Sequence, residues 1–161
     1  MSTVARNVVA KRSQYDDLAR SLTALLSGER DWIANLANTA ALLYNELADI
    51  NWAGFYLLKD GELVLGPFQG KPACVRIAMG KGVCGTAAQR RESVVVPNVR
   101  EFAGHIACDS ASNSELVVPL MWRDEVVGVL DIDSPRFDRF DDEDRRGVEK
   151  IAIVLISASR L

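Results

Sequence analysis

Residues 80–133 read GKGVCGTAAQRRESVVVPNVREFAGHIACDSASNSELVVPLMWRDEVVGVLDID, and the rest of the chain is organised around this stretch. It holds two of the three cysteines, the single histidine and a glycine-rich turn. It also places three acids, Glu115, Asp131 and Asp133, among apolar residues, where an unpaired charge is costly. Acids in such positions indicate a functional site.

Two pairs of apolar runs predict β-hairpins. Within the quoted stretch, residues 115–122 and 125–133 flank a short turn. Upstream, NWAGFYLL (51–58) and ELVLGPF (62–68) flank Asp60-Gly61, a strong hairpin signal. Consecutive hairpins predict an antiparallel sheet.

Helical periodicity lies on both sides of this sheet segment. Residues 14–27 and 31–46 carry apolar side chains at helical spacing, and the last segment begins with acids, which favour a helix start. We therefore predict an α+β fold in one domain, residues 1–161, with a helical segment at about 14–48, a sheet and pocket at about 51–133 and a helix at about 141–160. The terminal helices should cover one face of the sheet, and a pocket with a lid loop should lie on the other.

The overall composition is that of an ordinary globular protein. The 161 residues are 48% hydrophobic and 25% charged, and the net charge of −3 is spread along the chain. We expect neither nucleic acid nor a membrane surface as a partner. No signal peptide or long apolar run is present, which predicts a soluble, cytoplasmic protein.

The segment NVREFAGHIACDSASN, residues 98–113, shows no sustained period. A long irregular segment inside a compact domain is typical of a functional loop over a pocket. It carries His105, for which the pattern gives no firm role, and Cys108.

The turn at residues 80–85 matches the G-x-G-x-x-G pattern of dinucleotide-binding proteins. That pattern requires a parallel βαβ unit, whereas the hairpins predict antiparallel pairing. We therefore expect no nucleotide here, although the amides at this helix start could hold a small carboxylate.

The acids and aromatics of the predicted strands fall on defined faces. Asp131 and Asp133 share one face, and an odd-length turn at 122–124 would place Glu115 opposite Asp131. Three close carboxylates raise one another's pKa, although a solvated sheet face or a strand-end cap would also explain them. Trp52 and Tyr56 share a face with Gly54, which should leave space beside both rings, although such aromatics are more often simply core.

The three cysteines allow several readings. A free cysteine is commonly an inert small hydrophobe. Cys74, Cys84 and Cys108, together with His105, would form a Cys3His zinc set, but the chain has no C-x-x-C pair, so we expect no metal.

Residues 80–120, with Trp52 in NWAGFY before them and GVLDIDSP after them, resemble the free methionine-(R)-sulfoxide reductases, a family of GAF-fold enzymes. The resemblance implies that Cys108 is the catalytic cysteine and that Cys74 and Cys84 are candidate resolving thiols. It also implies that the pocket is lined by Trp52, Tyr56, Glu115, Asp131 and Asp133.

The expected activity is therefore reduction of free L-methionine (R)-sulfoxide to L-methionine. Cys108 would attack the sulfur while Glu115 or Asp133 protonates the oxygen. The resulting sulfenic acid would become a disulfide with Cys74 or Cys84, which a thioredoxin-type dithiol recycles without any bound cofactor. Asp131 would hold the substrate ammonium, and a homodimer could form through the N-terminal helices. The alternative is a non-enzymatic GAF domain that senses a small ligand or redox state.

Overall fold

The computed structural model describes residues 3–106 and 110–161, and side chains from residue 8 onward. Its helices are α1 (Thr3–Leu25), α2 (Trp32–Glu46), α3 (Gly82–Arg90) and α4 (Asp142–Ala158), with a short 3₁₀ helix η1 (Val99–Glu101). Its strands are β1 (Trp52–Lys59), β2 (Glu62–Gly70), β3 (Arg76–Ala78), β4 (Val94–Val96), β5 (Ser114–Trp122) and β6 (Glu125–Ser134). None of the helices in these ranges is long and apolar enough to cross a membrane.

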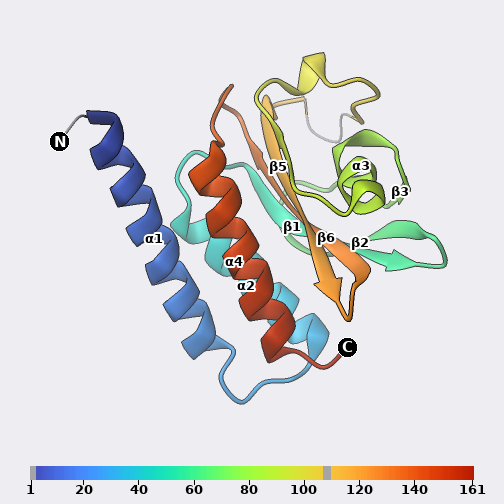
Figure 1. Ribbon diagram of the computed structural model, residues 1–161. Coiled ribbons are helices and arrows are strands. Elements are labelled where there is room, and N and C mark those ends of the chain that lie inside the picture. The colour runs from blue at the N-terminus through green and yellow to red at the C-terminus, as the bar shows by residue number, and fades with distance from the viewer. Residues whose placement is uncertain (1–2, 107–109) are drawn as a thin grey trace.

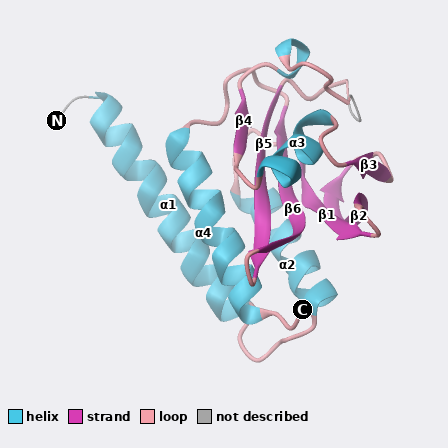
Figure 2. Ribbon diagram, turned by 45° about the vertical axis from the view of Figure 1, so that its right-hand side comes forward, coloured by secondary structure: helices cyan, strands magenta, loops and turns pink. Residues whose placement is uncertain are grey.

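The six strands form one sheet in the order β3-β2-β1-β6-β5-β4. Each neighbouring pair is antiparallel. Helices α2 and α4 cover one face, with α1 lying outside along α4, and α3 lies over the other face (Figures 1 and 2). This confirms the predicted α+β fold. The strands pair antiparallel, whereas the dinucleotide-binding pattern matched at residues 80–85 requires a parallel βαβ unit.

Strand β1 divides the interior into two cores by simple alternation. Ala53, Phe55 and Leu57 face the helices, whereas Trp52 and Tyr56 face α3. The predicted faces of this strand are therefore confirmed, and the aromatic pair lies on the pocket side.

Two tight turns set the register of the hairpins. Asp60 and Gly61 have φ angles of 51° and 84°, as a two-residue hairpin turn requires. Arg123 and Asp124 have φ angles of 48° and 62° between the paired residues Trp122 and Glu125. The second connection thus has two residues, so the odd-length turn that would place Glu115 opposite Asp131 is not formed.

Helix α1 is longer than predicted, since it begins at Thr3 and not near residue 14. Its first half lacks an obvious apolar stripe, and ion pairs with the start of α4 hold it in place. Lys11 Nζ lies 2.7 Å from Asp141 and 2.5 Å from Asp144, and Arg12 pairs with Glu143 at 2.6 Å. These contacts join residues more than 120 positions apart, so local sequence could not reveal them.

Candidate active site

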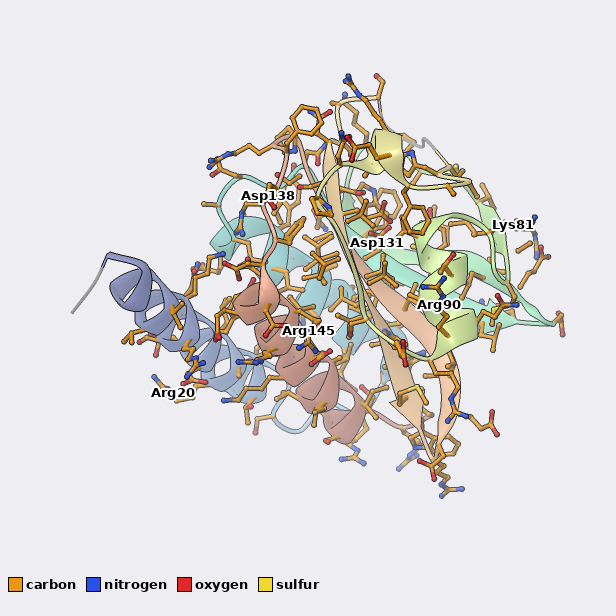
Figure 3. The ribbon with its side chains drawn as sticks, turned by 45° about the horizontal axis from the view of Figure 1, so that its top comes forward. Arg20, Lys81, Arg90, Asp131, Asp138 and Arg145 are labelled. Carbon is orange, nitrogen blue, oxygen red and sulfur yellow. The ribbon has the colours of Figure 1, made fainter. Side chains whose placement is uncertain are left out.

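A partly open cavity of about 40 Å³ lies on the α3 side of the sheet. Strands β1, β5 and β6 form its floor, the start of α3 forms one wall, and the segments around residues 71–73 and 105–106 close it. The predicted site residues that line it are Trp52, Tyr56, Cys84, Glu115, Asp131 and Asp133. Figure 3 labels Asp131 among the side chains on this side of the sheet. Six predicted site residues from four elements therefore share one cavity.

The strand register brings the three carboxylates together. Asp133 lies between Trp52 on β1 and Glu115 on β5, and Asp131 is paired with Val117. Glu115 is thus opposite Asp133 and not Asp131 as predicted, because the turn has two residues and a bulge follows Leu120. All three acids still reach the same cavity, since a shift of two residues preserves the face.

Glu115 and Asp131 are both buried, with 6% of each exposed. Burial raises the pKa of Glu115 well above its usual range, and the charges of Asp131 and Asp133 raise it further. Burial also raises the pKa of Asp131 to about 7, although hydrogen bonds from Cys84 and Glu115 oppose that rise. A protonated Glu115 that donates to an ionised Asp131 explains both the strongly raised pKa of Glu115 and the smaller rise at Asp131. The pair therefore holds a proton that can be transferred near neutral pH.

Cys84 lies in the first turn of α3 and points at this pair. Its thiol donates to Asp131 Oδ2 at 3.3 Å and lies 4.0 Å from Glu115 Oε1. Burial, and then the charges of the two acids, raise the pKa of Cys84 well above its usual range. Because only the thiolate is nucleophilic, Cys84 acts here as a neutral hydrogen-bond donor.

The two pocket aromatics also fix the segment that carries Cys74. Trp52 Nε1 donates to the Lys71 carbonyl at 3.1 Å, and the Tyr56 hydroxyl donates to the Cys74 carbonyl at 2.9 Å. The Trp52 ring stacks on Phe68 with centroids 5.3 Å apart. The space expected beside Gly54 is thus filled, since a Cβ there would lie 2.3 Å from Phe68 Cβ.

The chain is similar in sequence to known proteins over nearly its whole length. The GAF domain family model matches residues 31–158. A free methionine-R-sulfoxide reductase from Escherichia coli K12 is 57% identical over 145 residues, which are 90% of this chain and 88% of that protein. The chain is a GAF domain of the free methionine-R-sulfoxide reductase family.

Other members of this reductase family agree with the assignment. The Saccharomyces cerevisiae free methionine-R-sulfoxide reductase is 46% identical over 150 residues, 88% of this chain and 83% of that protein. The X-ray structure of the Neisseria meningitidis free methionine-R-sulfoxide reductase, in complex with its substrate, has a TM-score of 0.89. The two sequences are 43% identical, and the match covers 92% of this chain and 89% of the Neisseria chain.

The reductase-family cysteines differ in state. Cys74 is disulfide-bonded, whereas Cys84 is free and buried. Cys108 lies outside the described residues, so its catalytic role stays a prediction. With Cys74 in a disulfide, the Cys3His zinc set considered from the sequence does not form in this state.

His105 is the pocket residue that the sequence left without a role. Its Nε2 lies 3.7 Å from Glu115 Oε2, and burial lowers its pKa, which favours the neutral imidazole. No local pattern marked it, because it reaches the cavity from the irregular loop. Ser112, also on the cavity wall, was missed for the same reason.

Proposed function

We propose that this protein reduces free L-methionine (R)-sulfoxide to L-methionine as a thiol-dependent oxidoreductase. The observation that carries the proposal is the convergence of Glu115, Asp131 and Asp133 in one pocket, where burial raises the pKa of Glu115 and of Asp131. A sulfoxide oxygen leaves poorly until it is protonated, so a reductase needs an acid beside it. The E. coli and yeast relatives bear the name of this activity, and the Neisseria relative was solved with its substrate.

The substrate is larger than the 40 Å³ cavity, so the segments around residues 71–73 and 105–106 must move apart to admit it; the opened pocket then offers a contact for each part of the substrate. Asp131 and Asp133 hold the ammonium group, and the faces of Trp52 and Tyr56 pack on the S-methyl end. The backbone amides of residues 82–85, at the start of α3, bind the carboxylate. A pocket that binds both termini of an amino acid excludes methionine within a polypeptide.

In the chemical step, the Cys108 thiolate attacks the sulfoxide sulfur while Glu115 gives its proton to the oxygen. The protonated oxygen then passes as hydroxyl from the substrate sulfur to the Cys108 sulfur, while the sulfur–sulfur bond formed in the attack breaks. Methionine leaves with its sulfur reduced by two electrons, and Cys108, oxidised by two electrons, becomes a sulfenic acid. Glu115 is favoured over Asp133 as the donor, because burial and two neighbouring charges raise its pKa.

Cys74 is the resolving thiol in this scheme. It attacks the sulfenic sulfur, so that a disulfide forms and water leaves. Two observations support Cys74 over Cys84: Cys74 is disulfide-bonded, and the Cys84 thiol is free, buried and bonded to Asp131. A thioredoxin-type dithiol then reduces the disulfide by exchange, so that the cycle needs no bound cofactor.

This cycle requires a reducing compartment, so we infer a cytoplasmic enzyme. Its partners are the free sulfoxide and a thioredoxin-like reductant, with neither nucleic acid nor membrane involved. A homodimer through α1 is also proposed, since Val9 and Leu25 on that helix are exposed. Sizing at micromolar concentration tests the dimer.

The test of the function is NADPH-coupled turnover with a thioredoxin system. Free (R)-sulfoxide should be consumed, whereas free (S)-sulfoxide and a peptide-bound sulfoxide should not. Cys108→Ser should abolish turnover, and the matched neighbour variant Ser110→Ala should retain it. Substantial activity in Cys108→Ser would refute the assigned nucleophile.

The second candidate is a non-enzymatic GAF domain that binds a free amino acid. It would bind methionine or its sulfoxide through the same acids without consuming it. Calorimetric binding of the sulfoxide by reduced protein, with no methionine formed over hours, would favour this reading and overturn the proposed reduction.

A further inference from the structure

Three potential metal-ligating atoms converge in the cavity from three different elements. They are Cys84 Sγ from α3, a Glu115 oxygen from β5 and an Asp131 oxygen from β6, and all lie within 4.8 Å of one another. All three residues are buried. Asp131 Oδ1 is buried as well, yet it has no hydrogen-bond partner among residues 3–106 and 110–161. An unmatched buried carboxylate oxygen beside a thiol suits a cation.

We propose that this cluster is a binding site for a thiophilic divalent cation, Zn²⁺, with Cys84, Glu115 and Asp131 as protein ligands. In a tetrahedral zinc site, bonds of about 2.0–2.3 Å place neighbouring donor atoms about 3.5 Å apart. Cys84 Sγ lies 3.3 Å from Asp131 Oδ2 and 4.0 Å from Glu115 Oε1. The donors therefore need only small side-chain movements to close around an ion.

His105 lies outside the group of atoms within 4.8 Å of one another, and it supplies the fourth ligand when its loop brings the imidazole closer to that group. Its Nε2 lies 3.7 Å from Glu115 Oε2, again close to the separation of neighbouring zinc ligands. The neutral imidazole that burial favours is also the form that binds metal. One thiolate, one imidazole and two carboxylates form a donor set that suits zinc, whereas Mg²⁺ and Ca²⁺ prefer oxygen alone.

The size of the cavity suits an ion. Its volume of about 40 Å³ has room for roughly three water molecules, which is enough for a cation and a bound water. The site does not depend on the Cys74 thiol, because Cys74 is disulfide-bonded in the state described. It therefore differs from the Cys3His set considered from the sequence.

Zinc would occupy the acids that the proposed function assigns to the substrate ammonium and to proton transfer. This consequence rests on the proposed function: zinc and free methionine should compete for one site, so that zinc acts as a reversible inhibitor of the reductase. The binding itself does not depend on the protein being a reductase.

The test uses the full chain without a tag, oxidised to its disulfide form and stripped with a chelator. Zn²⁺ is titrated calorimetrically, and X-ray absorption of the zinc complex reports its ligands. We expect one ion per chain, with one sulfur ligand at about 2.3 Å. Cys84→Ser and Asp131→Asn should each weaken binding by more than about tenfold, whereas Asp16→Asn, which alters an exposed ion pair with Lys150, should not.

Displacement by the two enantiomers of methionine tests whether zinc and the amino acid share one site. L-methionine should displace zinc, whereas D-methionine, which chelates free zinc equally well, should not. A sulfur-free zinc shell, no stoichiometric binding, or equal affinity in wild type and Asp131→Asn would overturn the zinc site. Sulfoxide reduction without zinc binding would refute only this inference, and zinc binding without reduction would refute only the proposed function.

Discussion

At the scale of single residues, the chemistry depends on where one proton resides. Glu115 lies among Asp131, Asp133 and the Cys84 thiol, with no basic partner nearer than His105 at 3.7 Å among the described residues. Burial and like charges together favour the protonated acid. The same features that make these positions costly for folding make Glu115 a proton donor near neutral pH.

Replacing Glu115 with glutamine keeps the side-chain size but removes the transferable proton. We expect Glu115→Gln to lower kcat for free (R)-sulfoxide by about 10²–10⁴-fold, the usual contribution of a general acid. Initial rates at saturating substrate measure this. Glu101→Gln, which alters a glutamate on η1 bonded to Asn98, is the control and should keep its kcat. An unchanged kcat in Glu115→Gln would remove Glu115 from the mechanism.

The same burial predicts how stability depends on pH. Glu115 and Asp131 have raised pKa values, so the folded protein holds protons that the unfolded chain releases. Their contribution is complete below the unfolded pKa near 3.8–4.5 and is lost as pH rises through the folded values, about 7 for Asp131. The free energy of unfolding should therefore fall between about pH 5 and pH 8.

Denaturant unfolding at fixed disulfide state measures this slope. His105 contributes with the opposite sign, because burial lowers its pKa, so the comparison with Glu115→Gln isolates the acids. The free energy of unfolding of Glu115→Gln should depend less steeply on pH than that of the wild type. A wild-type stability that rises over this range, or equal slopes in both proteins, would contradict the shared proton.

At the scale of elements, the pocket aromatics connect β1 to the segment that carries Cys74. The Tyr56 hydroxyl is the group that binds the Cys74 carbonyl. Tyr56→Phe keeps the ring but loses a hydrogen bond worth about 1 kcal/mol. We expect slower disulfide formation in a single turnover, measured by rapid quench and thiol counting. Tyr44→Phe on α2 is the control, and equal rates in both variants would refute this positioning role.

The start of α4 holds α1 through one buried acid. Asp144 accepts from Lys11, Tyr15 and Arg139, and it completes the capping box with Asp141. Removing it leaves the buried Tyr15 hydroxyl without its acceptor and takes one partner each from Lys11 and Arg139, so Asp144→Ala should destabilise the fold by about 3 kcal/mol.

Denaturant unfolding measures that loss. Asp142→Ala removes an exposed acid two residues away in the same first turn of α4, and it should change the free energy of unfolding far less. If the two variants proved equally stable, the buried network would not be what joins α1 to the domain.

At the scale of the whole molecule, the sequence predicts what local chemistry determines. Asp31 caps α2, as its position before an apolar helix indicates, and Asp60-Gly61 forms the first hairpin turn. Alternation correctly assigned Trp52 and Tyr56 to one face and Asp131 to the pocket. These features depend on neighbours within a few residues, so a single sequence suffices.

The features that the sequence could not give depend on distant partners. The bulge after Leu120 places Glu115 opposite Asp133, and no residue pattern marks that bulge. The first half of α1 depends on ion pairs with α4, and Phe68 arrives beside Gly54 only through the β1–β2 register. His105 reaches Glu115 from a loop, which periodicity cannot position.

The most direct test of the proposed reductase cycle is one turnover of the fully reduced protein with one equivalent of free methionine (R)-sulfoxide. Mass spectrometry then counts methionine and thiols and maps the disulfide. We expect one methionine formed for two thiols lost, with Cys74 and Cys108 joined and Cys84 free. Methionine formed without thiol loss, or a disulfide that contains Cys84, would contradict it.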